Sequence, residues 1–193
     1  MKHMPNILTI LRLFACPLLI YLFYSNVHIF ENKNITLIAL IIFLFACITD
    51  FFDGYLARKK KLESNLGKIL DPIADKALII TISILLIIYG IGLPKTPFLI
   101  IILREIIVLS LRYDLSNADK SINVNLLSKF KTVIQMIAIT SVFIYYIYDK
   151  GKYSYFFENT SIWLLWFASI VTIFSGLQHY RTYLNLRKND TTN

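Results

Sequence analysis

The chain alternates long apolar runs with short polar stretches, and this pattern predicts six helices. The runs cover residues 7–24, 35–58, 69–89, 97–111, 130–148 and 162–183. Most of them approach the roughly 20 residues that an α-helix needs to cross a bilayer. We therefore expect an all-α integral membrane bundle of six transmembrane helices. The third run opens on Asp71-Pro72, and because proline favours the first turn of a helix, we expect that helix to start there.

The composition agrees with a membrane domain. The 193 residues are 56% hydrophobic and have a mean hydropathy of +0.61. No repeat, low-complexity tract or second domain interrupts the pattern, so we treat residues 1–193 as a single transmembrane domain. Both cysteines lie inside apolar runs, which argues against a disulfide framework or a zinc site.

Basic residues are distributed unevenly between the two sets of connecting segments. The formal net charge is +8, and the set that includes both ends of the chain carries most of the Lys and Arg residues. The positive-inside rule then predicts a multi-pass protein of the cell (inner) membrane with both termini in the cytoplasm. The positive excess is explained by topology and by anionic lipid headgroups rather than by nucleic acid.

Four aspartates between residues 50 and 75 are the strongest chemical feature. Asp50 and Asp53 are three residues apart, and Asp71 and Asp75 are four apart, so each pair shares a helix face. An ionised Asp in hydrocarbon costs about 3 kcal/mol, and neighbouring carboxylates also repel one another. A divalent cation offsets both costs, so we expect a metal and phosphate site in a polar cavity on the cytosolic side of the membrane. The alternative is structural ion pairing with nearby cations, namely Arg58, Lys76 or Arg104.

Small and basic residues accompany these aspartates at fixed offsets. The whole arrangement reads Asp50-x2-Asp53-Gly54-x2-Ala57-Arg58-x8-Gly67-x3-Asp71-x3-Asp75. It resembles the signature of the CDP-alcohol phosphatidyltransferases, and every signature position is matched. The resemblance implies an enzyme that transfers a phosphatidyl group from CDP-diacylglycerol to an alcohol.

The resemblance also implies a role for each signature residue. In the family the first three aspartates hold metal ions and the CDP pyrophosphate, and the last is regarded as the base on the acceptor hydroxyl. By resemblance Asp50, Asp53, Asp71 and Asp75 would bind two Mg²⁺ or Mn²⁺ ions, and Asp75 would also be catalytic. The CDP-binding positions would be Gly54, Ala57, Arg58 and Gly67.

The first apolar run opens on a further polar motif. It reads Pro5-Asn6-Ile7-Leu8-Thr9-Ile10-Leu11-Arg12, and it resembles the opening of the phosphatidylglycerophosphate synthase subgroup of the family. The resemblance implies that Asn6, Thr9 and Arg12 contribute to CDP binding. By themselves these residues are equally compatible with a helix start that carries a snorkelling arginine.

The fourth run contains a charged pair within apolar surroundings. Arg104-Glu105, followed by Arg112, resembles the same subgroup. The pair is compatible with simple mutual neutralisation. Alternatively Arg104 and Arg112 face the acid site or the phosphate of an acceptor.

The fifth run begins with a second basic motif. Lys129-Phe130-Lys131-Thr132 resembles the Gly-Lys-x-Lys-Thr motif of the subgroup, although Ser128 stands in place of the glycine. A cytosolic positive flank would have the same appearance. Because a phosphorylated acceptor needs cations, the acceptor-phosphate candidates are Arg104, Arg112, Lys129 and Lys131.

The predicted acceptor is sn-glycerol 3-phosphate, which would give phosphatidylglycerophosphate and CMP. The expected partners are CDP-diacylglycerol, a small phosphorylated alcohol and membrane lipids, and small residues in the helices are compatible with a homodimer. Phosphatidylglycerol (as in a cardiolipin synthase), serine and inositol phosphate remain alternative acceptors. Outside the family, the alternatives are a membrane prenyltransferase that binds Mg²⁺-pyrophosphate and a non-enzymatic carrier or channel.

Overall fold

The computed structural model describes an all-helical bundle over residues 4–60, 65–117, 126–148 and 153–188, with side chains at 11–49, 76–115, 130–148 and 153–187. Within these ranges the chain forms six α-helices, one short 3₁₀ turn and no strand, which confirms the predicted all-α class. The elements are α1 (Met4–Ser25), η1 (Ile29–Glu31), α2 (Lys33–Lys60), α3 (Asn65–Tyr89), α4 (Thr96–Asn117), α5 (Leu126–Tyr148) and α6 (Ser154–Lys188).

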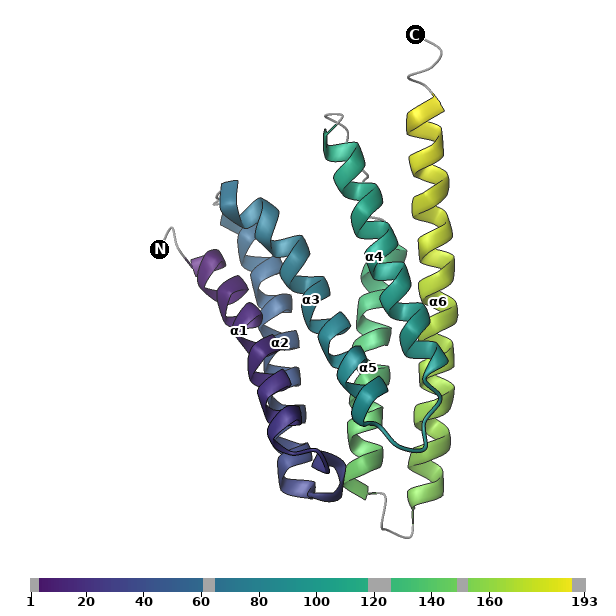
Figure 1. Ribbon diagram of the computed structural model, residues 1–193. Coiled ribbons are helices and arrows are strands. Elements are labelled where there is room, and N and C mark those ends of the chain that lie inside the picture. The colour runs from purple at the N-terminus through teal and green to yellow at the C-terminus, as the bar shows by residue number, and fades with distance from the viewer. Residues whose placement is uncertain (1–3, 61–64, 118–125, 149–152, 189–193) are drawn as a thin grey trace.

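Each helix runs antiparallel to the one before it, so the chain passes up and down the bundle (Figure 1). Helix α1 packs against α2 and α3, while α6 packs against α4 and α5. Contacts between α3 and α4 and between α2 and α5 join these two groups. Because the number of helices is even, the first and last helix ends lie at the same end of the bundle, which we call the terminal end.

Two helices among the described residues are long and apolar enough to cross a membrane. They contain the segments Phe130–Tyr148 in α5 and Ser154–Arg187 in α6. Shorter apolar stretches occur at Leu11–Ser25, Lys33–Thr49 and Lys76–Tyr89. Length and composition therefore support two spans, and the expected count of six stays a prediction.

Several helix boundaries differ from those expected, and α6 already begins at Ser154 rather than at residue 162. Helix α3 begins at Asn65, so Pro72 is an interior residue and not a first-turn residue as predicted. Helices α4 and α6 extend past the apolar runs, to Asn117 and Lys188. Hydropathy marks only the apolar part of a helix, whereas these polar ends have partners in the fold: Tyr183 on α6 donates a hydrogen bond to Asp114 on α4 over 2.6 Å.

Aromatic packing closes the end of the bundle opposite the termini. Phe30 of η1 stacks on Tyr146 of α5 with ring centroids 3.8 Å apart, and it meets Phe23 of α1 edge to face at 5.7 Å. The Tyr146 hydroxyl also donates a hydrogen bond of 2.8 Å to the carbonyl of Ile91 in the α3–α4 connection. Phe23 is fully buried and Tyr146 almost so. The core of this end is thus packed with aromatic side chains, and the predicted chemistry lies toward the other end.

Candidate active site

The alternating helices bring every predicted site segment into the terminal half of the bundle (Figure 1). This half contains the first part of α1, α3 and α5 and the last part of α2, α4 and α6. The predicted residues come from those parts of five helices, at positions 6–12, 50–58, 67–75, 104–112 and 129–131, with Arg104 near the middle of α4. Segments that are more than 100 residues apart in the chain therefore share one region of the fold.

The four aspartates occupy two helices that contact each other. Asp50 and Asp53 lie one turn apart on α2, and Asp71 and Asp75 lie one turn apart on α3. Their side chains lie outside the described residues, so the convergence of the four carboxylates stays a prediction. No cluster of three potential metal ligands occurs among the side chains that are described. As a donor set, four carboxylates from two adjoining helices fit a hard divalent cation, which prefers oxygen ligands.

The CDP-binding candidates are distributed over three helices, α1, α2 and α3. Gly54, Ala57 and Arg58 lie on α2, Gly67 on α3, and Asn6 and Thr9 near the start of α1, all with side chains outside the described residues. Arg12 is described, and its side chain is only 2% exposed. Such burial places its guanidinium inside the bundle, so the structure does not support a snorkelling arginine at this position.

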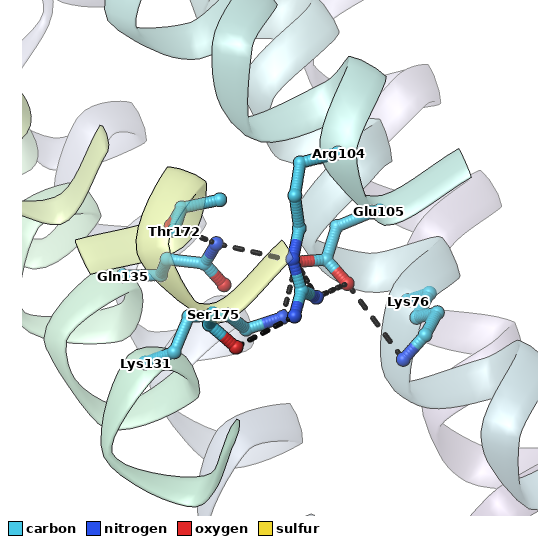
Figure 2. A network of polar contacts seen from close by, with 7 residues as sticks. All are labelled: Lys76, Arg104, Glu105, Lys131, Gln135, Thr172 and Ser175. Atoms are coloured by element: carbon cyan, nitrogen blue, oxygen red, sulfur yellow. Dashed lines mark hydrogen bonds and ion pairs between the residues drawn. The ribbon is translucent and has the colours of Figure 1, made fainter. Parts of the chain in front are cut away.

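A buried carboxylate on α4 contacts polar side chains from two other helices, α3 and α5 (Figure 2). Glu105 is 2% exposed and accepts a close hydrogen bond from the Lys131 ammonium of α5. Its Oε1 lies 3.3 Å from Nη1 of Arg104 and 3.3 Å from Nε2 of Gln135. Its Oε2 lies 3.7 Å from Nζ of Lys76 on α3. Glu105 is therefore the centre of an ion-pair network that links α3, α4 and α5.

Helix α6 supplies hydroxyl groups to the outer side of this network (Figure 2). Arg104 Nη2 donates to the Ser175 hydroxyl over 2.7 Å, and Gln135 Nε2 donates to the Thr172 hydroxyl over 2.9 Å. Thr172 and Ser175 are three residues apart, so both face the same side of α6. We call the seven residues drawn in Figure 2 the Glu105 network; they are Lys76, Arg104, Glu105, Lys131, Gln135, Thr172 and Ser175.

The close approach of α4 to α6 depends on a glycine. A Cβ atom added to Gly176 would lie 3.1 Å from Cγ and 3.6 Å from Nε of Arg104. The aliphatic stem of Arg104 therefore runs across the surface of α6 where a side chain is missing. This contact holds the guanidinium between Ser175 and Glu105.

The Glu105 network carries more positive than negative groups. Three of its members are cations, from Lys76, Arg104 and Lys131, and one is a carboxylate. Arg104 and Lys131 are 8% and 3% exposed. Burying a charge is costly unless it is paired, and Glu105 is the one carboxylate that the two buried cations Arg104 and Lys131 share among the described side chains. Such a site favours an additional anion, and a phosphate group is the anion that arginine and lysine commonly bind.

The four acceptor-phosphate candidates do not all lie at one place in the structure. Arg104 and Lys131 meet at Glu105, while Arg112 lies two turns further along α4 toward the terminal end. Lys129 lies near the start of α5, and its side chain is outside the described residues. The neutralising contact between Arg104 and Glu105 is present, but it is one part of a larger network.

Several network residues were not singled out as site residues in the sequence. Thr172 and Ser175 belong to a stripe of buried polar residues on α6 with helical spacing, and His179, 3% exposed, continues it one turn further on. His179 lies within electrostatic range of Arg112, Arg104 and Lys131. The stripe is visible in the sequence as small and polar residues every three to four positions within an otherwise apolar helix.

Comparison with known proteins decides the family. The model of the CDP-alcohol phosphatidyltransferase family matches residues 2–174 of the chain. This chain belongs to the CDP-alcohol phosphatidyltransferase family. As a family member it is a membrane-associated transferase that uses a divalent metal ion, which agrees with the donor chemistry of the four aspartates and with the apolar helices.

Curated relatives are similar to this chain over most of its length. A protein of Rickettsia typhi is 37% identical over 181 residues, which cover 94% of this chain and 97% of the relative. A protein of Bacillus subtilis is 30% identical over 187 residues, covering 93% and 94%. A Cereibacter sphaeroides protein is 41% identical over 142 residues, covering 72% and 62%. Each of these relatives is named CDP-diacylglycerol–glycerol-3-phosphate 3-phosphatidyltransferase.

Proposed function

We propose that this phosphatidyltransferase transfers the phosphatidyl group of CDP-diacylglycerol to sn-glycerol 3-phosphate, giving phosphatidylglycerophosphate and CMP. The observation that carries the choice of acceptor is the buried surplus of cations in the Glu105 network. An acceptor without a phosphate, such as serine, would leave that surplus uncompensated. The names of the relatives point to the same acceptor.

The aspartates of α2 and α3 are proposed to form the reaction centre. Asp50, Asp53, Asp71 and Asp75 would hold divalent metal, two Mg²⁺ or Mn²⁺ ions, which when bound would neutralise charge on the pyrophosphate. Asp75 would accept the proton of the acceptor hydroxyl. That oxygen forms a bond to the phosphorus that carries diacylglycerol, the bond from this phosphorus to the CMP oxygen breaks, and CMP leaves.

The two substrates are proposed to occupy different parts of the terminal half. The CDP moiety would lie along α1 and α2, where Gly54 and Ala57 would leave room for a close approach, and Gly67 near the start of α3 would contribute to the same site. Arg58 and Arg12 would bind its phosphates, with Asn6 and Thr9 as further contacts. The acceptor phosphate would lie between α4, α5 and α6, bound by Arg104, Lys131, Arg112 and Lys129.

We also propose a six-span topology with the reaction centre and both termini in the cytoplasm of the cell (inner) membrane. The up-and-down arrangement (Figure 1) and the excess of Lys and Arg in the sequence segments at the terminal end support this orientation. One substrate is a lipid and the other is soluble, so the reaction requires a site at the membrane surface. A homodimer is compatible with the apolar outer faces of the helices.

The deciding experiment is an acceptor panel with the purified protein. CDP-diacylglycerol and Mg²⁺ are supplied with glycerol 3-phosphate, phosphatidylglycerol, serine or inositol phosphate, CMP release is measured, and the lipid product is identified by mass spectrometry. We expect CMP release and phosphatidylglycerophosphate with glycerol 3-phosphate. CMP release with another acceptor alone would contradict the proposal, and flux of a solute without CMP release would indicate a carrier.

The metal requirement is tested in the same assay. Removal of divalent ions with EDTA should stop CMP release, and Mg²⁺ or Mn²⁺ added in excess should restore it. Undiminished activity in metal-free buffer would contradict the proposed role of the four aspartates. A titration with each metal separately would show which of the two supports turnover at the lower concentration.

A further inference from the structure

We infer that Ser175 on α6 is a positioning residue for the acceptor site: its hydroxyl holds the guanidinium of Arg104, and Thr172, one turn earlier, holds Gln135 in the same way. This inference rests on the proposed function, because Arg104 is one of the residues proposed to bind the acceptor phosphate. It gives α6 a part in acceptor binding, whereas the proposed phosphate ligands all come from α4 and α5.

The hydroxyls of α6 are the nearer anchors of both side chains (Figure 2). Nη2 of Arg104 lies 2.7 Å from Ser175 Oγ, whereas its Nη1 lies 3.3 and 3.4 Å from the two carboxylate oxygens of Glu105. Nε2 of Gln135 likewise lies 2.9 Å from Thr172 Oγ1 and 3.3 Å from Glu105 Oε1. Hydrogen bonds from N–H to oxygen are most often about 2.9–3.0 Å long. The contacts with α6 are therefore the tighter ones, and those with Glu105 are long.

Three other hydroxyls on α6 serve the helix itself. Those of Thr160, Ser169 and Thr182 donate to the carbonyl four residues earlier, at 2.8, 2.9 and 3.0 Å. Such bonding to the own backbone is common for serine and threonine inside a helix. The hydroxyls of Thr172 and Ser175 instead accept hydrogen bonds from side chains of α5 and α4, and both residues are buried. These two hydroxyls therefore serve the neighbouring helices.

The backbone of α6 constrains the same arginine next to Ser175. A Cβ atom at Gly176 would lie 3.1 Å from Cγ of Arg104, so the arginine stem lies against the helix. A guanidinium is a rigid planar fork, so holding the stem and one terminal nitrogen fixes the direction of the whole group. Each terminal nitrogen has two N–H groups, so Arg104 can keep its contacts with Ser175 and Glu105 and still donate to a phosphate oxygen. Ser175 thereby pre-organises Arg104 for its ligand.

The test is the variant Ser175→Ala, which removes the hydroxyl and places a good helix former at the position. KM for glycerol 3-phosphate should rise about fivefold or more, because Arg104 loses its nearest anchor. The kcat and the KM for CDP-diacylglycerol should stay within about twofold, because Ser175 lies neither at the proposed reaction centre nor at the proposed CDP site. An unchanged KM for glycerol 3-phosphate, or a similar loss in all three constants, would overturn the inference.

Ser110→Ala is the matched control. It removes an exposed hydroxyl that donates over 2.8 Å to the carbonyl of Ile107 in its own helix, α4. All three kinetic constants should equal those of the wild type. A rise in KM equal to that of Ser175→Ala would show that the loss of any hydroxyl from these helices has the same effect, and would overturn the inference.

Two variants of Thr172 separate the hydroxyl from packing, and they decide if Ser175→Ala does not fold. Thr172→Val keeps the shape of the side chain and loses the hydroxyl, so KM for glycerol 3-phosphate should rise about threefold or more. Thr172→Ser keeps the hydroxyl and loses a methyl group, so this KM should stay within about twofold. The reverse order, or equal values, would mean that Thr172 acts by packing alone and would overturn the inference.

A double-mutant cycle shows whether Ser175 acts through Arg104. Arg104→Met keeps an unbranched stem and removes the guanidinium, so in this background Ser175→Ala should change KM for glycerol 3-phosphate by less than about twofold. A full fivefold rise there would overturn the inference. These results are separate from the acceptor panel: if the wild type forms phosphatidylglycerophosphate but the Ser175 and Thr172 variants keep its KM, only this inference fails, whereas no product from glycerol 3-phosphate removes the proposed function itself.

Discussion

The Tyr183 hydroxyl on α6 donates a hydrogen bond to Oδ2 of Asp114 on α4 over 2.6 Å, across 69 residues of sequence. Nη1 of Arg187 donates to the same hydroxyl over 3.1 Å. Tyr183 is 7% exposed, so this contact fixes the polar ends of the two helices that carry Arg104 and Ser175. The contact between Tyr183 and Asp114 lies nearer the ends of α4 and α6 than the Glu105 network does. It therefore supports the network without being part of it.

Tyr183→Phe should weaken the association of α4 with α6. The variant removes one hydrogen bond, and such a loss typically costs about 1 kcal/mol, equivalent to a fall in Tm of about 3 °C for a domain of this size. Thermal unfolding in detergent measures it. Tyr180→Phe, at an exposed position of the same helix, is the control and should leave Tm unchanged. Equal Tm values for the Tyr183 variant and the wild type would contradict a supporting role for this contact.

Gly176→Ala should damage acceptor binding more than stability. The new Cβ would lie 3.1 Å from Cγ of Arg104, so the arginine stem must shift by a few tenths of an ångström. Alanine favours the helix by up to about 1 kcal/mol over glycine, which offsets part of the strain. We expect KM for glycerol 3-phosphate to rise about threefold or more with little change in Tm. An unchanged KM would show that Arg104 moves freely, contrary to its fixed position between Ser175 and Glu105.

Lys131→Ala should weaken the binding of a phosphorylated acceptor. Lys131 is the closest cation to Glu105 and is 3% exposed, and its removal also takes one positive charge from the site. KM for glycerol 3-phosphate should rise about tenfold or more, measured by CMP release at saturating CDP-diacylglycerol. Lys95→Ala, at an exposed position in the α3–α4 connection, should have no effect. If both variants keep the wild-type KM, the acceptor phosphate binds elsewhere.

Asp75→Asn should abolish turnover, but the variant should still bind the lipid substrate. The variant keeps the size of the side chain but removes its ability to accept a proton, and general bases typically contribute a factor of about 10² to 10⁴ to the rate. CMP release should fall by at least about a hundredfold, while binding of CDP-diacylglycerol should change by less than about threefold. Full activity in this variant would exclude Asp75 as the base.

The sequence predicted the helices well because their determinants are local. Apolar runs of sufficient length mark each of the six helices. Boundaries were wrong where a helix continues past its apolar run, as near Asp114 and Pro72 and at the start of α6. The aspartate pairs could also be predicted from the sequence, because the two members of each pair lie three or four residues apart. Glu105 was interpreted only as a partner of its neighbour Arg104, since no local pattern links it to Lys131 or Lys76.

Periodicity and short-range spacing by themselves determined the all-α class, the pairing of the aspartates along single helices and the resemblance to the family that the comparisons then established. Only the tertiary structure decided that Glu105 meets Lys131, 26 residues away, and that Arg104 meets Ser175, 71 residues away. The physical reason is that helix formation depends on contacts within one or two turns, whereas the net charge of a buried site depends on which helices pack together and on what each presents at the interface.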